Sequence, residues 1–375
     1  MKLNRFSMFA IGAAVLTLSA CTEADQFDTY TKDGKKYITT INVSNVTPEL
    51  GTRTYFDTSD GNYGKVYWEN GVNYSSTTPD ELYFYEVNSS TCSNVFICEN
   101  PETFQDPYGR ASFKTKWSHN GLAVPNNYYA YYFPGYTNHY YNNVMPLHQW
   151  EWQGDDDDAL RAFLRSYDFL KPEESHHPDG YINITDGNST IYMDHFFSLI
   201  IIDLNYDSDY KQYPPKPTGE EPYFNSVTIS TKTQNAFGNK LMVDENGVMK
   251  TEAATYSISL RRTDNQSDLT LGCPKQLLRY FFVVENKNEM EDLTINFICA
   301  DDPNNSKGVH FTGKKDNGVV VERIKFKAGM CYHLEFKTEC RDMRPYNVEN
   351  WNQYGSIEVL TSEEDLHSMG LWQEQ

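Results

Sequence analysis

The chain has 375 residues, of which 39% are hydrophobic and 22% charged, with 52 acidic side chains against 32 basic ones. This length suits two ordinary domains or one large sandwich, and the hydrophobic share excludes a disordered chain. The net charge of -20 excludes nucleic acid as an expected partner, because a phosphate backbone would be repelled. Aromatic residues make up 15% of the chain, including 28 Tyr, which is typical of β structure.

The first residues predict an export signal. Lys2 and Arg5 give a basic start, residues 8–18 form a short apolar run, and residues 18–21 read Leu-Ser-Ala-Cys. This ending resembles a bacterial lipobox, which implies cleavage before Cys21 and acylation of its thiol and amine. We therefore expect a signal peptide over residues 1–20 and lipid chains on Cys21 that hold the protein at a membrane. The alternative is an ordinary signal with a chance Cys.

Strand signals follow a polar tether over residues 21–36. Residues 37–43, Tyr-Ile-Thr-Thr-Ile-Asn-Val, are the first strong strand, with apolar residues separated by polar ones. Turn clusters rich in Gly, Asn and Asp separate the later strand-like runs. In the first half these runs cover residues 65–68, 82–87, 128–133, 190–193 and 197–204.

One amphipathic helix interrupts the strands. Four acidic residues at 155–158 precede apolar residues spaced as on one helical face, and acidic side chains favour a helix start. Pro172 ends this pattern. The apolar positions are Leu160, Phe163, Leu164, Tyr167 and Leu170.

A proline-rich segment over residues 213–222 predicts the domain boundary, because four Pro residues exclude a central strand or helix there. Short strand-like runs resume after it, up to residues 356–360. We therefore expect an all-β protein with two antiparallel β-sandwich domains in tandem, over residues 37–212 and 223–375, with the helix in the first.

Cysteine numbers agree with export. Without Cys21, six Cys remain, an even number that permits disulfides in an exported chain. Cys92 and Cys98 are close enough in sequence to form one of them. Buried free thiols are the alternative.

Several motifs, in order along the chain, resemble the fimbrillin family, the two-domain subunits of lipoprotein-derived (type V) fimbriae of Bacteroidales-type bacteria. Besides the lipobox, they are residues 51–54 (Gly-Thr-Arg-Thr), 66–71 (Val-Tyr-Trp-Glu-Asn-Gly), 128–134 (Tyr-Tyr-Ala-Tyr-Tyr-Phe-Pro), 167–170 (Tyr-Asp-Phe-Leu), 195–200 (His-Phe-Phe-Ser-Leu-Ile) and 326–334 (Phe-Lys-Ala-Gly-Met-Cys-Tyr-His-Leu). The match is looser in the second half, and cysteines are unusual in the family's main shaft subunits.

The resemblance implies transthyretin-like sandwiches and a surface-exposed, lipid-anchored subunit of an outer-membrane fimbria that serves attachment. Its partners would be other fimbrial subunits, joined by donor-strand exchange, and a host glycan or protein ligand. In the family an arginine-specific protease removes the first strand. Here that strand would be residues 37–43, and Arg53 is the matching cleavage site. A plain surface arginine in a turn is the alternative.

The donor segment would be the C-terminal tail. Residues 356–360 alternate apolar and polar side chains, and further apolar residues follow an acidic stretch. The alternative is that this segment is the last strand of its own sandwich. The donor candidates are Ile357, Val359, Leu366, Leu371 and Trp372.

Other polar groups give no catalytic or metal signature. The His176-His177 pair near Asp179 is expected to be a solvated loop, and Asp168 with His195 a structural hydrogen bond. We expect no metal, no cofactor and no enzymatic activity. A glycan-binding lipoprotein remains the alternative function, because aromatic residues can stack on sugars. The aromatic cluster is Tyr128, Tyr129, Tyr131, Tyr132, Tyr136, Tyr140, Tyr141, Trp150 and Trp152.

Overall fold

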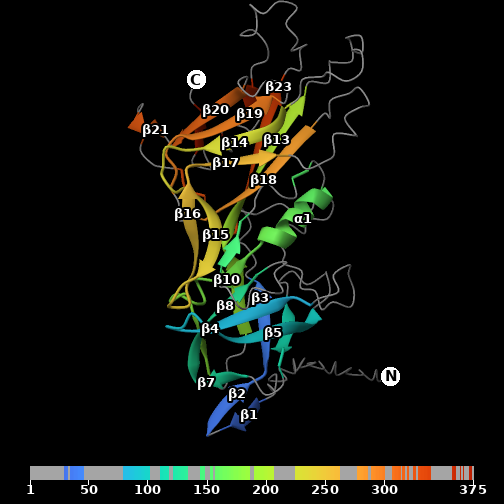
Figure 1. Cartoon of the computed structure of the whole chain (residues 1–375), viewed down its shortest axis with the longest axis vertical. Helices are drawn as coiled ribbons and strands as arrows, with labels where there is room; N and C mark the ends of the chain where they lie inside the picture. Colours follow the sequence, from blue (N-terminus) through green and yellow to red (C-terminus); the bar gives the residue numbers. More distant parts are fainter. Residues whose placement is uncertain are drawn as a thin grey trace, which may run out of the picture.

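The computed structural model describes 25 strands and one helix, so the all-β prediction with one helix is confirmed (Figure 1). The described residues are 29–32, 34–45, 79–101, 110–117, 121–133, 144–147, 153–154, 157–185, 190–206, 224–261, 277–285, 289–299, 306–313, 315–316, 319–320, 324–326, 328–338, 357–359, 364, 366 and 371–373.

The first half is built on one eight-stranded sheet with the order β10-β12-β3-β6-β5-β4-β8-β11. Its strands are β3 (Thr40–Asn45), β4 (Glu81–Glu86), β5 (Cys92–Pro101), β6 (Ala111–Thr115), β8 (Asn126–Tyr132), β10 (Leu170–Pro172), β11 (Ile182–Ile184) and β12 (Thr190–His195). A pairing of Leu170 with Tyr132 joins β10 to β8 and closes seven strands into a ring. The first half is therefore a closed sheet where we expected two facing ones.

The ring encloses a core of its own, to which alternate residues of each strand contribute. Ile41 and Val43 of β3 face Phe113 and Ala111 of β6 in register. A small sheet continues from the ring and consists of β1 (Thr29–Lys32), β2 (Lys35–Ile38) and β7 (Leu122–Val124).

The second half is a sandwich of two sheets around another core. One sheet has the order β18-β13-β23-β24, from β13 (Phe197–Tyr206), β18 (Leu277–Glu285), β23 (Cys331–Thr338) and β24 (Ile357–Val359). The other has the order β17-β14-β19-β20-β25, from β14 (Phe224–Ser230), β17 (Ser257–Arg261), β19 (Leu293–Cys299), β20 (Ser306–Gly313) and β25 (Leu371–Gln373). A two-stranded hairpin comprises β21 (Lys315–Asp316) and β22 (Val319–Val320).

Strand β13 corrects the expected domain assignment. The sequence predicts this strand in the first domain, but it pairs antiparallel with β18 and parallel with β23 of the second half. Its apolar run explains this position, because Ile200 and Ile202 face the sandwich core while Leu199 and Ile201 face the first half. The expected linker at residues 213–222 lies outside the described part of the chain.

The two halves share a third core. The helix α1 (Asp157–Tyr167) lies beside β13 and β18 (Figure 1) and packs Leu160, Phe163 and Tyr167 into this core, with Leu164 partly buried against it. The predicted helix was too long, because Leu170 and Pro172 belong to strand β10 and Leu170 lies in the ring core. A three-stranded sheet of β9 (Val144–Pro146), β15 (Phe237–Val243) and β16 (Met249–Thr255) also contributes. The hairpin β15–β16 runs from the sandwich to the ring, and Tyr131 Oη donates to the carbonyl of Gly247 in the turn of this hairpin. The halves are thus packed together through a continuous apolar interface.

Candidate functional site: the position of strand β3

Strand β3 occupies an interior position of the ring. It pairs antiparallel with β6 and parallel with β12, through four residue pairs on each side. Parallel pairing is unusual in an otherwise antiparallel sheet. The parallel neighbour, β12, comes from residues far along the chain from β3. If β3 left this position, a slot bounded by β6 and β12 would remain in the sheet.

The slot is apolar on its inner side. Ile41 and Val43 are almost fully buried, with exposed fractions of 0% and 1%. The flanking strands contribute Phe113, Ile191 and Met193 to the same core. Ile41 and Val43 are two residues apart, so both side chains point to the same inner face of the ring.

The predicted first strand, residues 37–43, is divided in the structure. Tyr37 and Ile38 belong to β2, which pairs with β7, whereas residues from Thr40 belong to β3. The division falls at Thr39, whose carbonyl accepts a hydrogen bond from Thr115 N–H. The segment that fills the slot therefore extends further, to Asn45.

Cys21, the expected lipidation site, and Arg53, the expected cleavage site, both lie outside the described residues. Arg53 follows β3 by eight positions in the sequence. Within the described part of the chain, no helix is both long and apolar enough to cross a bilayer.

The C-terminal tail lies at two sheet edges of the second half. Ile357 and Val359 belong to β24, which is held by three residue pairs with β23. Leu371 and Trp372 belong to β25, which is held by three pairs with β20. Leu366 is buried in the sandwich core. In this conformation the tail completes its own sandwich, which is the alternative that the sequence left open.

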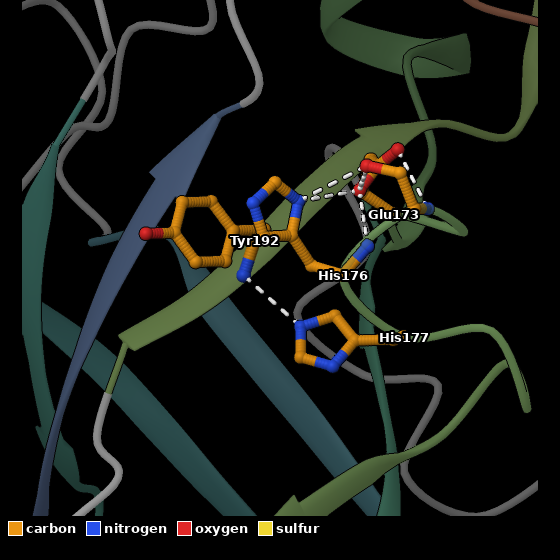
Figure 2. Close-up of polar contacts among 5 residues, drawn as sticks. Glu173, His176, His177 and Tyr192 are labelled. Carbon is orange, nitrogen blue, oxygen red and sulfur yellow. Dashed lines mark hydrogen bonds and ion pairs between the residues drawn. The ribbon is translucent and has the colours of Figure 1, made fainter.

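The other side of β12 is held by a loop that follows β10 (Figure 2). His176 stacks on Tyr192 of β12, with ring centroids 3.9 Å apart. The backbone N–H of Tyr192 donates to Nε2 of His177, so an imidazole takes the place of a strand carbonyl. His177 is buried rather than solvated, which corrects our expectation of a solvated loop for this residue.

Hydrogen bonds and burial shift the pKa values of Glu173 and His177 in this loop. Burial would raise the pKa of Glu173, but hydrogen bonds from the side chains and backbone of Ser175 and His176 lower it to about 2. Burial, followed by the nearby His176, lowers the pKa of His177. A neutral His177 retains the lone pair that accepts the Tyr192 N–H.

Asp168 and His195 are hydrogen-bonded, as predicted. The hollow that they line with Leu164, Tyr167 and Met330 has only about 20 Å³ of free volume. That is room for about one water molecule. This pair is consequently a structural contact and lies in no substrate-sized cleft.

Cys92 and Cys98 are free thiols, so the predicted disulfide is wrong. Both belong to the extended strand β5, where six residues span about 20 Å. A register shift next to Cys92 places it in the core shared by the halves, whereas Cys98 lies in the ring core. Burial raises the pKa of each thiol to about 12.

The described part of the aromatic cluster is mainly core. Tyr128 and Tyr131 are buried, and Tyr129 and Tyr132 are half-buried. Tyr129 stacks on Tyr131, with ring planes 6° apart. The remaining members lie outside the described residues: Tyr136, Tyr140, Tyr141, Trp150 and Trp152.

In comparisons with known proteins, the chain matches solved structures. No family model and no curated protein matches it. A candidate cell adhesion protein from Bacteroides uniformis is 10% identical with a TM-score of 0.40, over 88% of this chain and 98% of that one. The tip fimbrial protein Mfa3 from Porphyromonas gingivalis is 9% identical with a TM-score of 0.32, over 85% and 97%.

The fimbrial anchor protein Mfa2 from Porphyromonas gingivalis is also 9% identical, with a TM-score of 0.33 over 89% of this chain and 96% of that one. These structural neighbours are proteins of the class that the sequence motifs resemble.

Proposed function

We propose that this chain is a subunit of a cell-surface fimbria that serves attachment, and that it assembles by exchange of β3 for a strand of a neighbouring subunit. The observation that carries the proposal is the position of β3, which fills an apolar slot between β12 and β6. Backbone hydrogen bonds on both sides and two pockets are what strand addition requires. The transthyretin-like nature of the second half, a sandwich of two sheets, is part of the same proposal.

The tail offers a matching donor. Ile357 and Val359 are two residues apart, as Ile41 and Val43 are, so both pairs present side chains to one face at the same spacing. Because β24 and β25 are edge strands with three residue pairs each, detaching them breaks few backbone hydrogen bonds. The sandwich would still retain its central strands after the tail leaves.

Export as a lipoprotein with acyl chains on Cys21, anchoring at the outer membrane and a non-enzymatic role complete the proposal. A host glycan or protein would be the ligand. The glycan-binding alternative receives less support, because Tyr128 and Tyr131, the most buried of the described cluster residues, offer no stacking surface.

Protease treatment tests the assembly proposal. Purified chain beginning at Cys21 is incubated with an arginine-specific protease, and heat-stable ladders are sought on a gel. The matched variant Arg53→Lys resists that protease but is still cut by trypsin. We expect ladders from the unmodified chain with either protease, and from Arg53→Lys with trypsin alone. Cleavage next to residue 53 that yields monomer only would contradict strand exchange.

The donor is tested separately with the double substitution Ile357→Asn and Val359→Asn, which keeps Leu366 in the core. We expect the cleaved variant to remain monomeric while the uncleaved variant stays folded. The matched control is the single change Glu358→Gln, which leaves the apolar spacing intact and is expected to form ladders. Normal ladders from the double variant would exclude this segment as the donor.

A further inference from the structure

A polar cluster lies on the β18-β13-β23 sheet, apart from the β3 slot. Asp203 of β13 is in register with Arg279 of β18 on one side and Glu335 of β23 on the other. His333 is two residues from Glu335 on the same strand, so its side chain lies on the same face. Four charged or ionisable side chains therefore meet on adjacent strands of one sheet.

Their contacts fix Asp203 in place. Arg279 Nε donates to Oδ1 at 2.7 Å and its terminal nitrogen to Oδ2 at 2.8 Å. His333 Nε2 lies 2.8 Å from the same Oδ2 and 3.9 Å from Glu335 Oε1. The Asp203 side chain is 5% exposed, whereas His333 and Glu335 are 39% and 46% exposed. The cluster thus has a rigid buried carboxylate and two ligands open to solvent.

The spacing suits a tetrahedral metal site. One imidazole nitrogen and two carboxylate oxygens lie within 4.8 Å of one another. Tetrahedral bonds of about 2.0–2.1 Å to zinc place neighbouring ligand atoms about 3.3 Å apart. The observed separations of 2.8 and 3.9 Å bracket that value. Small rotations of the exposed His333 and Glu335 side chains would make these two separations equal.

The charge and the surroundings of the cluster also suit a dication. Asp203 and Glu335 carry two negative charges against one positive charge on Arg279, which leaves a net charge of -1 on these three side chains. Arg279 donates to both carboxylate oxygens of Asp203, and a contact of this kind would orient the carboxylate as a ligand. A mixed set of imidazole and carboxylate favours zinc-type ions over calcium, which prefers oxygen alone.

We propose that Asp203, His333 and Glu335 bind a zinc-type divalent cation, with the fourth position open to water or to a group of a bound partner. No local sequence motif indicates this site, because Asp203 and His333 are 130 residues apart. The competing interpretation is a salt bridge of Asp203 and Arg279 with a hydrogen bond from His333. That interpretation needs no metal.

Titration calorimetry with zinc chloride on tag-free full chain distinguishes the two. We expect one saturable equivalent for the unmodified chain, and at least tenfold weaker binding in Glu335→Gln and in His333→Ala. The control is His176→Ala, which removes an exposed imidazole beside Glu173 and is expected to bind zinc normally. Glu335→Gln keeps the shape of an exposed side chain, so the test does not depend on a variant that fails to fold.

Thermal unfolding gives the second readout. Zinc should raise the Tm of the unmodified chain and of His176→Ala but not of Glu335→Gln, because a ligand of the folded state stabilises it. The proposal is overturned if the unmodified chain binds no zinc saturably. It is equally overturned if Glu335→Gln and His333→Ala bind zinc as tightly as the unmodified chain, or if only His176→Ala loses binding.

Discussion

The side-chain amide of Gln153 makes both hydrogen bonds that a neighbouring strand would make to Phe281. Its Nε2 donates to the carbonyl of Phe281 at 2.9 Å, and the Phe281 N–H donates to its Oε1 at 2.8 Å. Phe281 lies in β18, which pairs with β13 on its other edge. An open strand edge invites pairing with another chain, so Gln153 closes an edge that would otherwise compete with the proposed assembly site.

Replacing Gln153 by Ala should destabilise the fold. The two buried backbone groups of Phe281 would lose their partners, at about 1–3 kcal/mol for each. Urea unfolding followed by tryptophan fluorescence measures the change. Gln153→Glu is the matched control, because its carboxylate still accepts from the N–H but cannot donate to the carbonyl. We expect Gln153→Glu to lose at least as much stability as Gln153→Ala, because it also buries a negative charge facing the Phe281 carbonyl. Equal stability of all three chains would contradict the role assigned to Gln153.

Strand exchange predicts different effects of two core substitutions before and after assembly. Ile41→Ala should lower the free energy of unfolding of the uncleaved chain by about 2–5 kcal/mol, because Ile41 is fully buried. It should leave the polymer unchanged, because β3 is absent there. The control Phe113→Ala alters the wall of the slot and should weaken both forms. Heat resistance of the ladders checks this, and a polymer weakened by Ile41→Ala would mean that β3 stays.

The Glu173 loop predicts a loss of stability in acid. The pKa of Glu173 is about 2 in the folded chain against an ordinary value of 4.5, so its contribution to stability is complete above about pH 5. That contribution falls as the pH drops from 4.5 towards 2, because the unfolded state then binds the proton more readily. Solvent screening reduces it to about 1–2 kcal/mol.

Urea unfolding of the unmodified chain and of Glu173→Gln, at pH 7 and at pH 3, measures this contribution. We expect Glu173→Gln to be the less stable chain at pH 7 and the difference to be smaller at pH 3. The exposed substitution Glu174→Gln is the control, and a difference that does not change with pH would contradict the assignment.

The rate of thiol labelling should distinguish Cys92, Cys98 and Cys331 by how deeply their side chains are buried. Cys92 and Cys98, with pKa values of about 12 and buried side chains, should resist iodoacetamide in the folded chain at pH 8 and react fully in urea. Cys331 is half-buried and should react sooner. Peptide mass spectrometry identifies the labelled residues. A peptide in which Cys92 and Cys98 are joined would contradict the structure.

The sequence by itself determined the features that depend on neighbouring residues. The helix was predicted from the spacing of Leu160, Phe163 and Tyr167, and these side chains are buried as expected. The apolar run that includes Ile200 and Ile202 was predicted as a strand. Such local features follow from the periodicity of helices and strands, which the sequence contains directly.

The tertiary structure alone decided which distant segments meet. The parallel pairing of β3 with β12, the imidazole of His177 in place of a carbonyl and the edge closed by Gln153 leave no trace in local periodicity. The failed prediction of a disulfide has the same origin, since a register shift separates Cys92 and Cys98 between two cores. Pairing between remote strands depends on the packing of the whole chain, so it cannot be predicted from the spacing of residues within one segment.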